Sequence, residues 1–129
     1  MTFSHDIKSL HLLGSSHHVA ELGVREKISL PQGEIDEFYN GLSKLPGLDE
    51  CLLLNTCNRT EIYGASKNGF TPDLLQKYLS EFRKLDPDFL REHSYIHSGE
   101  KVVRHLFEVT SGIDSQMVGE TEILGQVKK

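Results

Sequence analysis

The sequence has 129 residues, a length that suits one domain with a buried core. Its formal net charge is −5 with histidine neutral, so it lacks the excess of Lys and Arg that drives non-specific binding of nucleic acid. No run approaches the roughly 20 apolar residues of a membrane-crossing helix, and Met1–Leu10 has no apolar segment of signal-peptide type. We therefore expect a cytoplasmic protein without a membrane partner.

The first elements expected are a strand and a helix. Apolar residues ending at a glycine and two serines predict a strand over Ser9–His17, followed by a loop rich in histidine and charge. After Pro31, apolar residues recur at a spacing close to 3.6, which predicts an amphipathic helix. Pro46 and Gly47 are expected to end this helix.

A hairpin is expected in the middle of the chain. Cys51–Thr56 is a short apolar segment typical of a buried strand, and Thr60–Ala65 predicts a second strand. Only the polar tripeptide Cys57-Asn58-Arg59 separates them. Such a short connection indicates a hairpin or a sharp corner at these three residues.

The second half of the chain predicts mostly helices. Thr71 resembles a helix N-cap because Pro72 and an acid follow it, and Pro87 is expected to stop that helix. Tyr95–His97 predicts a weak strand, and Ser98 is expected to cap a third helix. A further helical pattern begins near Glu120.

This order of elements predicts the fold class. We expect an α+β two-layer sandwich, ferredoxin-like, with a mostly antiparallel sheet, helices on one face and extra C-terminal helices. The pattern stops at Lys129 without Gly, Pro or a cap, which indicates a piece of a longer protein, although terminal lysines also suit a natural helix end.

Cys51 and Cys57 are the only cysteines. On one strand they would lie about 20 Å apart, too far for a disulfide, so both are expected to be free thiols. Cys51 begins an apolar run and is interpreted as a core residue. Cys57 lies in the densest polar cluster of the chain and is the candidate nucleophile.

Arg59 lies two residues from that thiol. A guanidinium favours the thiolate form of a nearby cysteine and can also bind a carboxylate with two hydrogen bonds. A nucleophile beside such a group suits an acidic acyl substrate. The competing interpretation is that Cys57 is a small turn residue and that Arg59 pairs with Glu61.

Histidines offer weaker signals. His105 lies at the edge of the apolar face of the third predicted helix, where a packed residue and a catalytic residue are both reasonable interpretations. His17 and His18 could bind substrate or metal, but the paired spacings of a zinc site are absent and no metal is expected. No G-x-G-x-x-G fingerprint of a dinucleotide site occurs in the sequence.

Two long motifs resemble the glutamyl-tRNA reductase family. The first is Asn55-Thr56-Cys57-Asn58-Arg59-Thr60-Glu61-Ile62-Tyr63, and the second runs from Ser111 to Lys128. The segment Gly14–Glu26 fits the family as well, so the resemblance covers essentially the whole chain. It implies that residues 1–129 form the N-terminal catalytic domain, which binds glutamyl-tRNA and forms a thioester, and that the NADPH-binding and dimerisation domains lie outside this chain.

The resemblance also implies residue roles. Cys57 matches the nucleophile, and His105 matches a histidine important for activity. The positions that match substrate-binding residues are Thr56, Asn58, Arg59, Ser115, Glu120, Thr121, Glu122 and Gln126. Many relatives have Gly-Glu-Pro-Gln where this chain has Gly119-Glu120-Thr121-Glu122, so Glu122 replaces an amide with an acid.

The activity implied is the reduction of glutamyl-tRNA(Glu) to glutamate 1-semialdehyde with NADPH, the first step of tetrapyrrole biosynthesis. Cys57 would take the glutamyl group as a thioester, Arg59 would hold a substrate carboxylate and His105 would transfer a proton or polarise the carbonyl. The family also implies a homodimer in the full-length protein and product transfer to glutamate-1-semialdehyde aminomutase.

Two other interpretations remain at this stage. A thiol hydrolase or acyltransferase of another family could use Cys57 and a histidine without any nicotinamide cofactor. A non-catalytic RNA-binding module is the other, and the charge of −5 argues against it.

Overall fold

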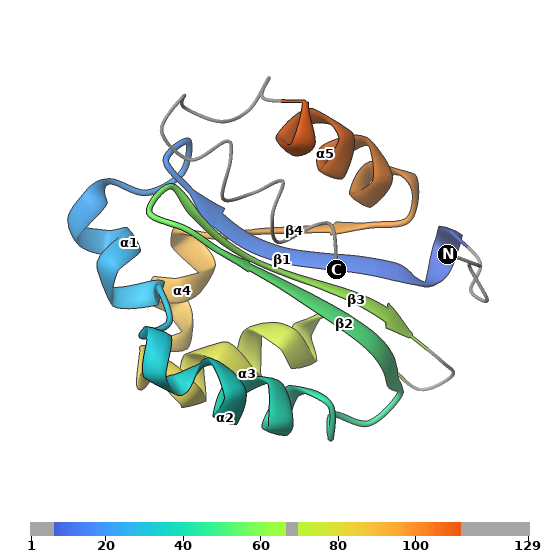
Figure 1. Ribbon diagram of the computed structural model, residues 1–129, viewed down its shortest axis with the longest axis horizontal. Coiled ribbons are helices and arrows are strands. Elements are labelled where there is room, and N and C mark those ends of the chain that lie inside the picture. The colour runs from blue at the N-terminus through green and yellow to red at the C-terminus, as the bar shows by residue number, and fades with distance from the viewer. Residues whose placement is uncertain (1–6, 67–69, 112–129) are drawn as a thin grey trace.

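A four-stranded antiparallel sheet forms the centre of the protein (Figure 1). It is seen in a computed structural model that describes residues 7–66 and 70–111. The strand order is β2-β3-β1-β4. The strands are β1 (Leu10–Ser16), β2 (Leu48–Asn55), β3 (Arg59–Ser66) and β4 (Tyr95–Ser98).

Helices cover both faces of this sheet. In Figure 1, α1 to α4 lie on one side of the strands and α5 lies on the other. The helices are α1 (Leu22–Ile28), α2 (Ile35–Leu42), α3 (Asp73–Arg83), α4 (Pro87–Glu92) and α5 (Glu100–Thr110), with short 3-10 turns η1 (Ile7–Ser9) and η2 (Gln32–Glu34). Among the residues that the structure describes, no helix is long and apolar enough to cross a membrane.

Neighbouring apolar residues of each central strand explain the two covered faces. Successive side chains of a strand point to opposite sides of the sheet. Leu13 and Ile62 therefore pack against α1–α4, whereas Leu12 and Tyr63 pack against α5. Because both faces of the sheet carry apolar side chains, helices on both sides are needed to bury them from solvent.

The α+β class and the antiparallel sheet predicted from the sequence are confirmed. The two-layer arrangement is wrong for the described residues, since α5 adds a third layer over the face formed by Leu12, Leu54 and Tyr63. The prediction that helices occupy one face holds for α1 to α4 alone. The ferredoxin-like assignment stays a prediction.

The starts of three helices differ from those predicted from the sequence. Pro87 begins α4 instead of only stopping α3, because the Asp86 side chain caps the new helix by accepting a hydrogen bond from the Asp88 backbone N–H at 2.9 Å. Ser98 is not the cap of α5; the N-cap residue is Gly99. Helix α3 begins one residue later than Thr71 would require, with Pro72 as its N-cap.

The predicted hairpin is confirmed and places Cys57 at its tip. Strands β2 and β3 pair antiparallel with Asn55 opposite Thr60. Beyond that pair, the backbone N–H of Thr56 donates to the carbonyl of Arg59 at 2.8 Å. The turn is therefore closed by the sheet's own hydrogen bonding, and Cys57 is carried on a short, fixed connection.

We predict that Gly41→Ala destabilises the fold by about 1–3 kcal/mol through overpacking. A Cβ at this position of α2 would lie 2.1 Å from the Tyr78 hydroxyl oxygen, which donates to the Phe38 carbonyl at 2.8 Å. Urea unfolding measures the change. Gly23→Ala in α1 is the matched control and should not destabilise, because no atom of the described residues, apart from chain neighbours and the backbone of its own helix, lies within 4 Å of its Cβ. Equal losses for both variants would contradict the packing argument.

Candidate active site

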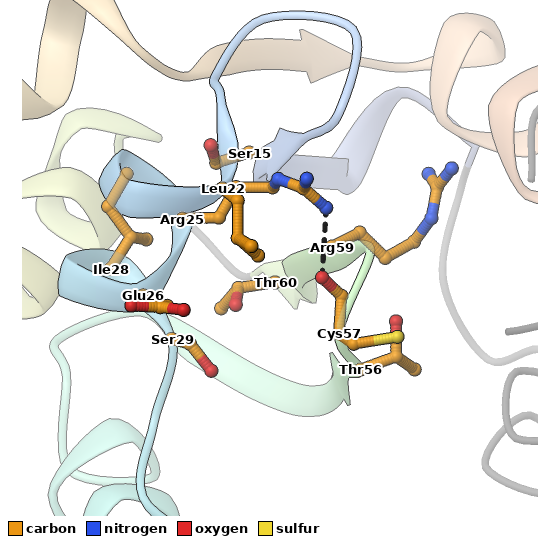
Figure 2. Close-up of a pocket in the computed structure, with 10 residues that line it drawn as sticks. All are labelled: Ser15, Leu22, Arg25, Glu26, Ile28, Ser29, Thr56, Cys57, Arg59 and Thr60. Carbon is orange, nitrogen blue, oxygen red and sulfur yellow. Dashed lines mark hydrogen bonds between the residues drawn. The ribbon is translucent and has the colours of Figure 1, made fainter. Parts of the chain in front are cut away.

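The turn that carries Cys57 is held by two segments distant in sequence. The backbone N–H of His17 donates to the Asn58 carbonyl at 3.1 Å. The Arg25 side chain in α1 donates from Nη1 to the Cys57 carbonyl at 2.9 Å, the dashed line in Figure 2. The Thr56 hydroxyl accepts the Asn58 N–H at 3.2 Å. The backbone around an exposed thiol is therefore fixed at several points.

A small pocket of about 160 Å³ opens beside this turn. Figure 2 shows the Cys57 carbonyl directed at Arg25, with the sulfur on the side of the turn away from α1. Arg25 was not among the site residues predicted from the sequence. The pocket is lined by Ser15, Leu22, Arg25, Glu26, Ile28, Ser29, Thr56, Cys57, Arg59 and Thr60.

Glu61 is a fully buried carboxylate surrounded by donors. Tyr63 donates its hydroxyl to Oε1 at 2.8 Å. Arg59 Nη1 lies 3.2 Å from Oε2, His105 Nε2 lies 2.5 Å from the same oxygen, and the Tyr95 hydroxyl also donates to it. A carboxylate that accepts several charged or polar donors offsets the cost of burial.

The surroundings of Glu61 shift the pKa values of the groups in this cluster. Burial raises the pKa of the Glu61 carboxyl, but the hydrogen bond from His105 and the charges of His105 and Arg59 outweigh it, so this pKa is lowered. Burial and the Glu61 charge raise the pKa of the hydroxyls of Tyr63 and Tyr95. The two tyrosines therefore remain protonated donors to an ionised carboxylate.

Arg59 points into this cluster. Its guanidinium side chain is 0% exposed and pairs with Glu61, and Figure 2 shows it turned away from Arg25. The part of the competing interpretation that pairs Arg59 with Glu61 is thus confirmed, whereas its other part, a Cys57 that serves only the turn, is not tested. The roles of Arg59 as a carboxylate clamp and as an activator of Cys57 stay predictions.

Asn58 is almost fully buried beside Cys57, with 5% of its surface exposed. Within residues 7–66 and 70–111, its side-chain Nδ2 is buried without a hydrogen-bond partner. A buried donor without a partner costs free energy, so this amide is suited to bond a ligand. Thr56 is also buried, and its hydroxyl belongs to the turn.

The remaining candidate site residues fall into three groups. His105 joins the Glu61 cluster from α5, packed on the rings of Tyr95 and His97 at 5.5 Å between centroids. The rings of His17 and His18 lie 4.1 Å apart, and no group of three potential metal ligands occurs in the described part of the chain. Outside the described residues lie Ser115, Glu120, Thr121, Glu122 and Gln126.

The two thiols differ in exposure, and both are free. Cys51 is half-buried against the core below α1–α4, and burial raises the pKa of its thiol. We predict that iodoacetamide alkylates Cys57 at least about tenfold faster than Cys51, because the reactive thiolate must be both formed and accessible. Peptide mapping of samples quenched over time measures both rates. Faster modification of Cys51 would contradict the arrangement described here.

Comparison with known proteins identifies the family. The model of the family described as "Glutamyl-tRNAGlu reductase, N-terminal domain" matches residues 13–129. This chain belongs to that family. The resemblance predicted from the two sequence motifs is thereby confirmed, and Cys57, Glu61 and His105 all lie within the matched residues.

Individual relatives agree with the family match. Glutamyl-tRNA reductases of Heliobacterium mobile and Syntrophotalea carbinolica are 39% and 40% identical, and each match covers 92% of this chain and 27% of the relative. A solved structure of glutamyl-tRNA reductase from Methanopyrus kandleri has a TM-score of 0.69 at 32% identity, covering 94% of this chain and 27% of that one. The chain therefore spans about a quarter of these reductases.

Proposed function

We propose that this chain is the glutamyl-tRNA-binding and thioester-forming domain of an NADPH-dependent glutamyl-tRNA reductase. The observation that carries the proposal is the exposed thiol of Cys57, fixed at the tip of the β2–β3 hairpin in a chain of this family. The whole enzyme would convert glutamyl-tRNA(Glu) to glutamate 1-semialdehyde for tetrapyrrole biosynthesis in the cytoplasm.

The chemistry proposed for this domain is acyl transfer. The sulfur of Cys57 attacks the carbonyl carbon of the glutamyl ester, forming a C–S bond. The C–O bond to the terminal ribose breaks, and the departing oxygen takes up the proton that the thiol has lost. The products are a glutamyl thioester on Cys57 and tRNA with a free terminal hydroxyl.

Fixed polar groups around Cys57 would assist this step. Arg25 holds the Cys57 carbonyl at 2.9 Å and thereby restricts the backbone of the nucleophile. The buried amide of Asn58 has a donor to offer the substrate. His105 would act as the acid–base group, and Arg59 would add positive charge. The other proposed substrate contacts are Thr56, Ser115, Glu120, Thr121, Glu122 and Gln126.

NADPH does not fit the part of the chain that the structure describes. A Rossmann-type dinucleotide site has a glycine-rich turn between a strand and a helix, and the sequence has no G-x-G-x-x-G. We propose that NADPH binds to a part of the protein outside this chain. The homodimer contacts and the transfer of product to glutamate-1-semialdehyde aminomutase are proposed for the full-length protein.

Incubating this chain with glutamyl-tRNA(Glu) tests the proposal. Intact-mass spectrometry after rapid quenching should reveal one added glutamyl group, and hydroxylamine should remove it as expected for a thioester. Uncharged tRNA with free glutamate serves as the control and should give no adduct. If glutamyl-tRNA gives neither an adduct nor deacylation above the uncatalysed rate, acyl transfer is not the function of this domain.

A further inference from the structure

The carboxylate of Glu61 holds His105 by one ring nitrogen. Nε2 of His105 lies 2.5 Å from Oε2 of Glu61, in a pair whose side chains are 13% and 0% exposed. An ionised carboxylate only accepts hydrogen bonds, so the nitrogen that faces it carries a proton. The contact therefore selects the ring form of His105 that is protonated at Nε2.

Glu61 is itself held in one orientation. Every second side chain of β3 points to the face that α5 covers, and these side chains include Arg59, Glu61 and Tyr63. Tyr63 donates to Oε1, whereas Arg59 and Tyr95 donate to Oε2. Because donors engage both oxygens, the carboxylate cannot rotate away from His105 without breaking other buried hydrogen bonds.

The second ring nitrogen of His105, Nδ1, is available to accept a proton. Within residues 7–66 and 70–111, Nδ1 makes no hydrogen bond, and the hydrogen bond of the ring to Glu61 runs through Nε2. In a neutral ring protonated at Nε2, Nδ1 carries a lone pair and can accept a proton. The Tyr95 and His97 rings, each 5.5 Å away between centroids, restrict how the imidazole can turn.

We propose that Glu61 is a positioning residue that acts through His105, making Nδ1 the atom that exchanges a proton during acyl transfer. This inference rests on the proposed function. Nδ1 takes the thiol proton through water as the C–S bond forms at Cys57, since His105 is not among the residues that line the pocket beside this thiol. It returns that proton to the ribose oxygen as the C–O bond breaks, so the ring ends neutral. While the ring is charged, the Glu61 carboxylate stabilises it across the Nε2 contact.

Nitrogen NMR of the unmodified chain tests the ring form directly. Samples labelled with ¹⁵N on histidine should show Nε2 protonated and Nδ1 unprotonated for His105 near pH 7, with a strongly downfield Nε2–H proton. Glu61→Gln keeps the shape of the side chain and removes its charge, so this proton resonance should move upfield. A wild-type ring protonated at Nδ1 instead would overturn the inference without the need for any variant.

Single-turnover kinetics test whether Glu61 acts through His105. Glu61→Gln should slow thioester formation by about 100-fold, in the range expected for impaired acid–base catalysis. In a His105→Asn background the same substitution should cost less than about threefold, because the partner is already gone. Tyr78→Phe removes a tyrosine hydroxyl that bonds the Phe38 carbonyl, on the opposite face of the sheet from Glu61, and is the matched control, with a rate within about threefold of wild type.

Each result separates the inference from the proposed function. A full 100-fold loss in the His105→Asn background would assign Glu61 a structural role only and overturn the inference. Absence of both a Cys57 adduct and catalysed deacylation in the wild-type chain overturns the proposed function and, with it, the role of Nδ1. An adduct in wild type, together with an Nδ1-protonated His105, overturns the inference alone.

Discussion

Cys57→Ser should abolish the covalent glutamyl adduct and lower deacylation of glutamyl-tRNA by at least about 10³-fold. A serine hydroxyl is a far weaker nucleophile than a thiolate unless a strong base activates it. The substitution changes one atom on an exposed side chain, so the fold should be unaffected. Intact-mass spectrometry and release of labelled glutamate measure the two effects.

Cys51→Ser is the matched control for this prediction. Cys51 lies on β2, half-buried against the core, six positions before the nucleophile. It should leave adduct formation within about twofold of wild type while lowering stability slightly, since a hydroxyl replaces a half-buried thiol. An adduct that survives in Cys57→Ser, or that disappears in Cys51→Ser, would mean that the wrong sulfur has been assigned.

Local patterns were enough to predict where Cys57 lies. Two apolar segments with three polar residues between them can pair only through a short turn, and hydrogen bonding within the hairpin follows from that spacing. The period of two along β3 also puts Arg59 and Glu61 on one face, which is why their pairing was an open alternative from the start. Short-range geometry carries these features, and the sequence displays it directly.

The rest of the cluster depends on contacts that no local spacing reveals. Tyr95 and His105 reach Glu61 from positions 34 and 44 residues away. Their approach is decided by β4 pairing with β1 and by α5 packing over Tyr63. Arg25 is a similar case, because its role at the turn depends on where α1 packs. Such tertiary contacts need the fold before they can be named.

Two helices, α1 and α4, were not predicted from the sequence, for different reasons. Helix α1 has only seven residues, and the charge around Arg25 hides its short apolar pattern. Helix α4 was missed because Pro87 was interpreted only as a stop, although a proline after an aspartate is also a typical helix start. Both helices are short, and burial of Ile28 and Leu90 in the common core supports them.

The largest expected loss of stability is at the buried pair. Arg59→Met should lower the free energy of unfolding by about 3–5 kcal/mol, because it removes the guanidinium that pairs with the Glu61 carboxylate in a site where both side chains are 0% exposed. Arg104→Met is the control. Its guanidinium lies 3.6 Å from Glu100 with both side chains largely exposed, so the expected loss is at most about 0.5 kcal/mol. Urea unfolding at pH 7 measures both.

The acid limb of the stability curve identifies the cause of that loss. The pKa of Glu61 is lowered from the ordinary 4.5. Stability from its ionised form is therefore fully present above about pH 4.5 and is lost as the pH falls through the lowered pKa. Glu61→Gln should flatten this limb, and Arg59→Met/Glu61→Gln should be more stable at pH 7 than Arg59→Met. If the double variant is instead less stable than Arg59→Met, lost packing rather than an unbalanced carboxylate explains the cost of removing Arg59.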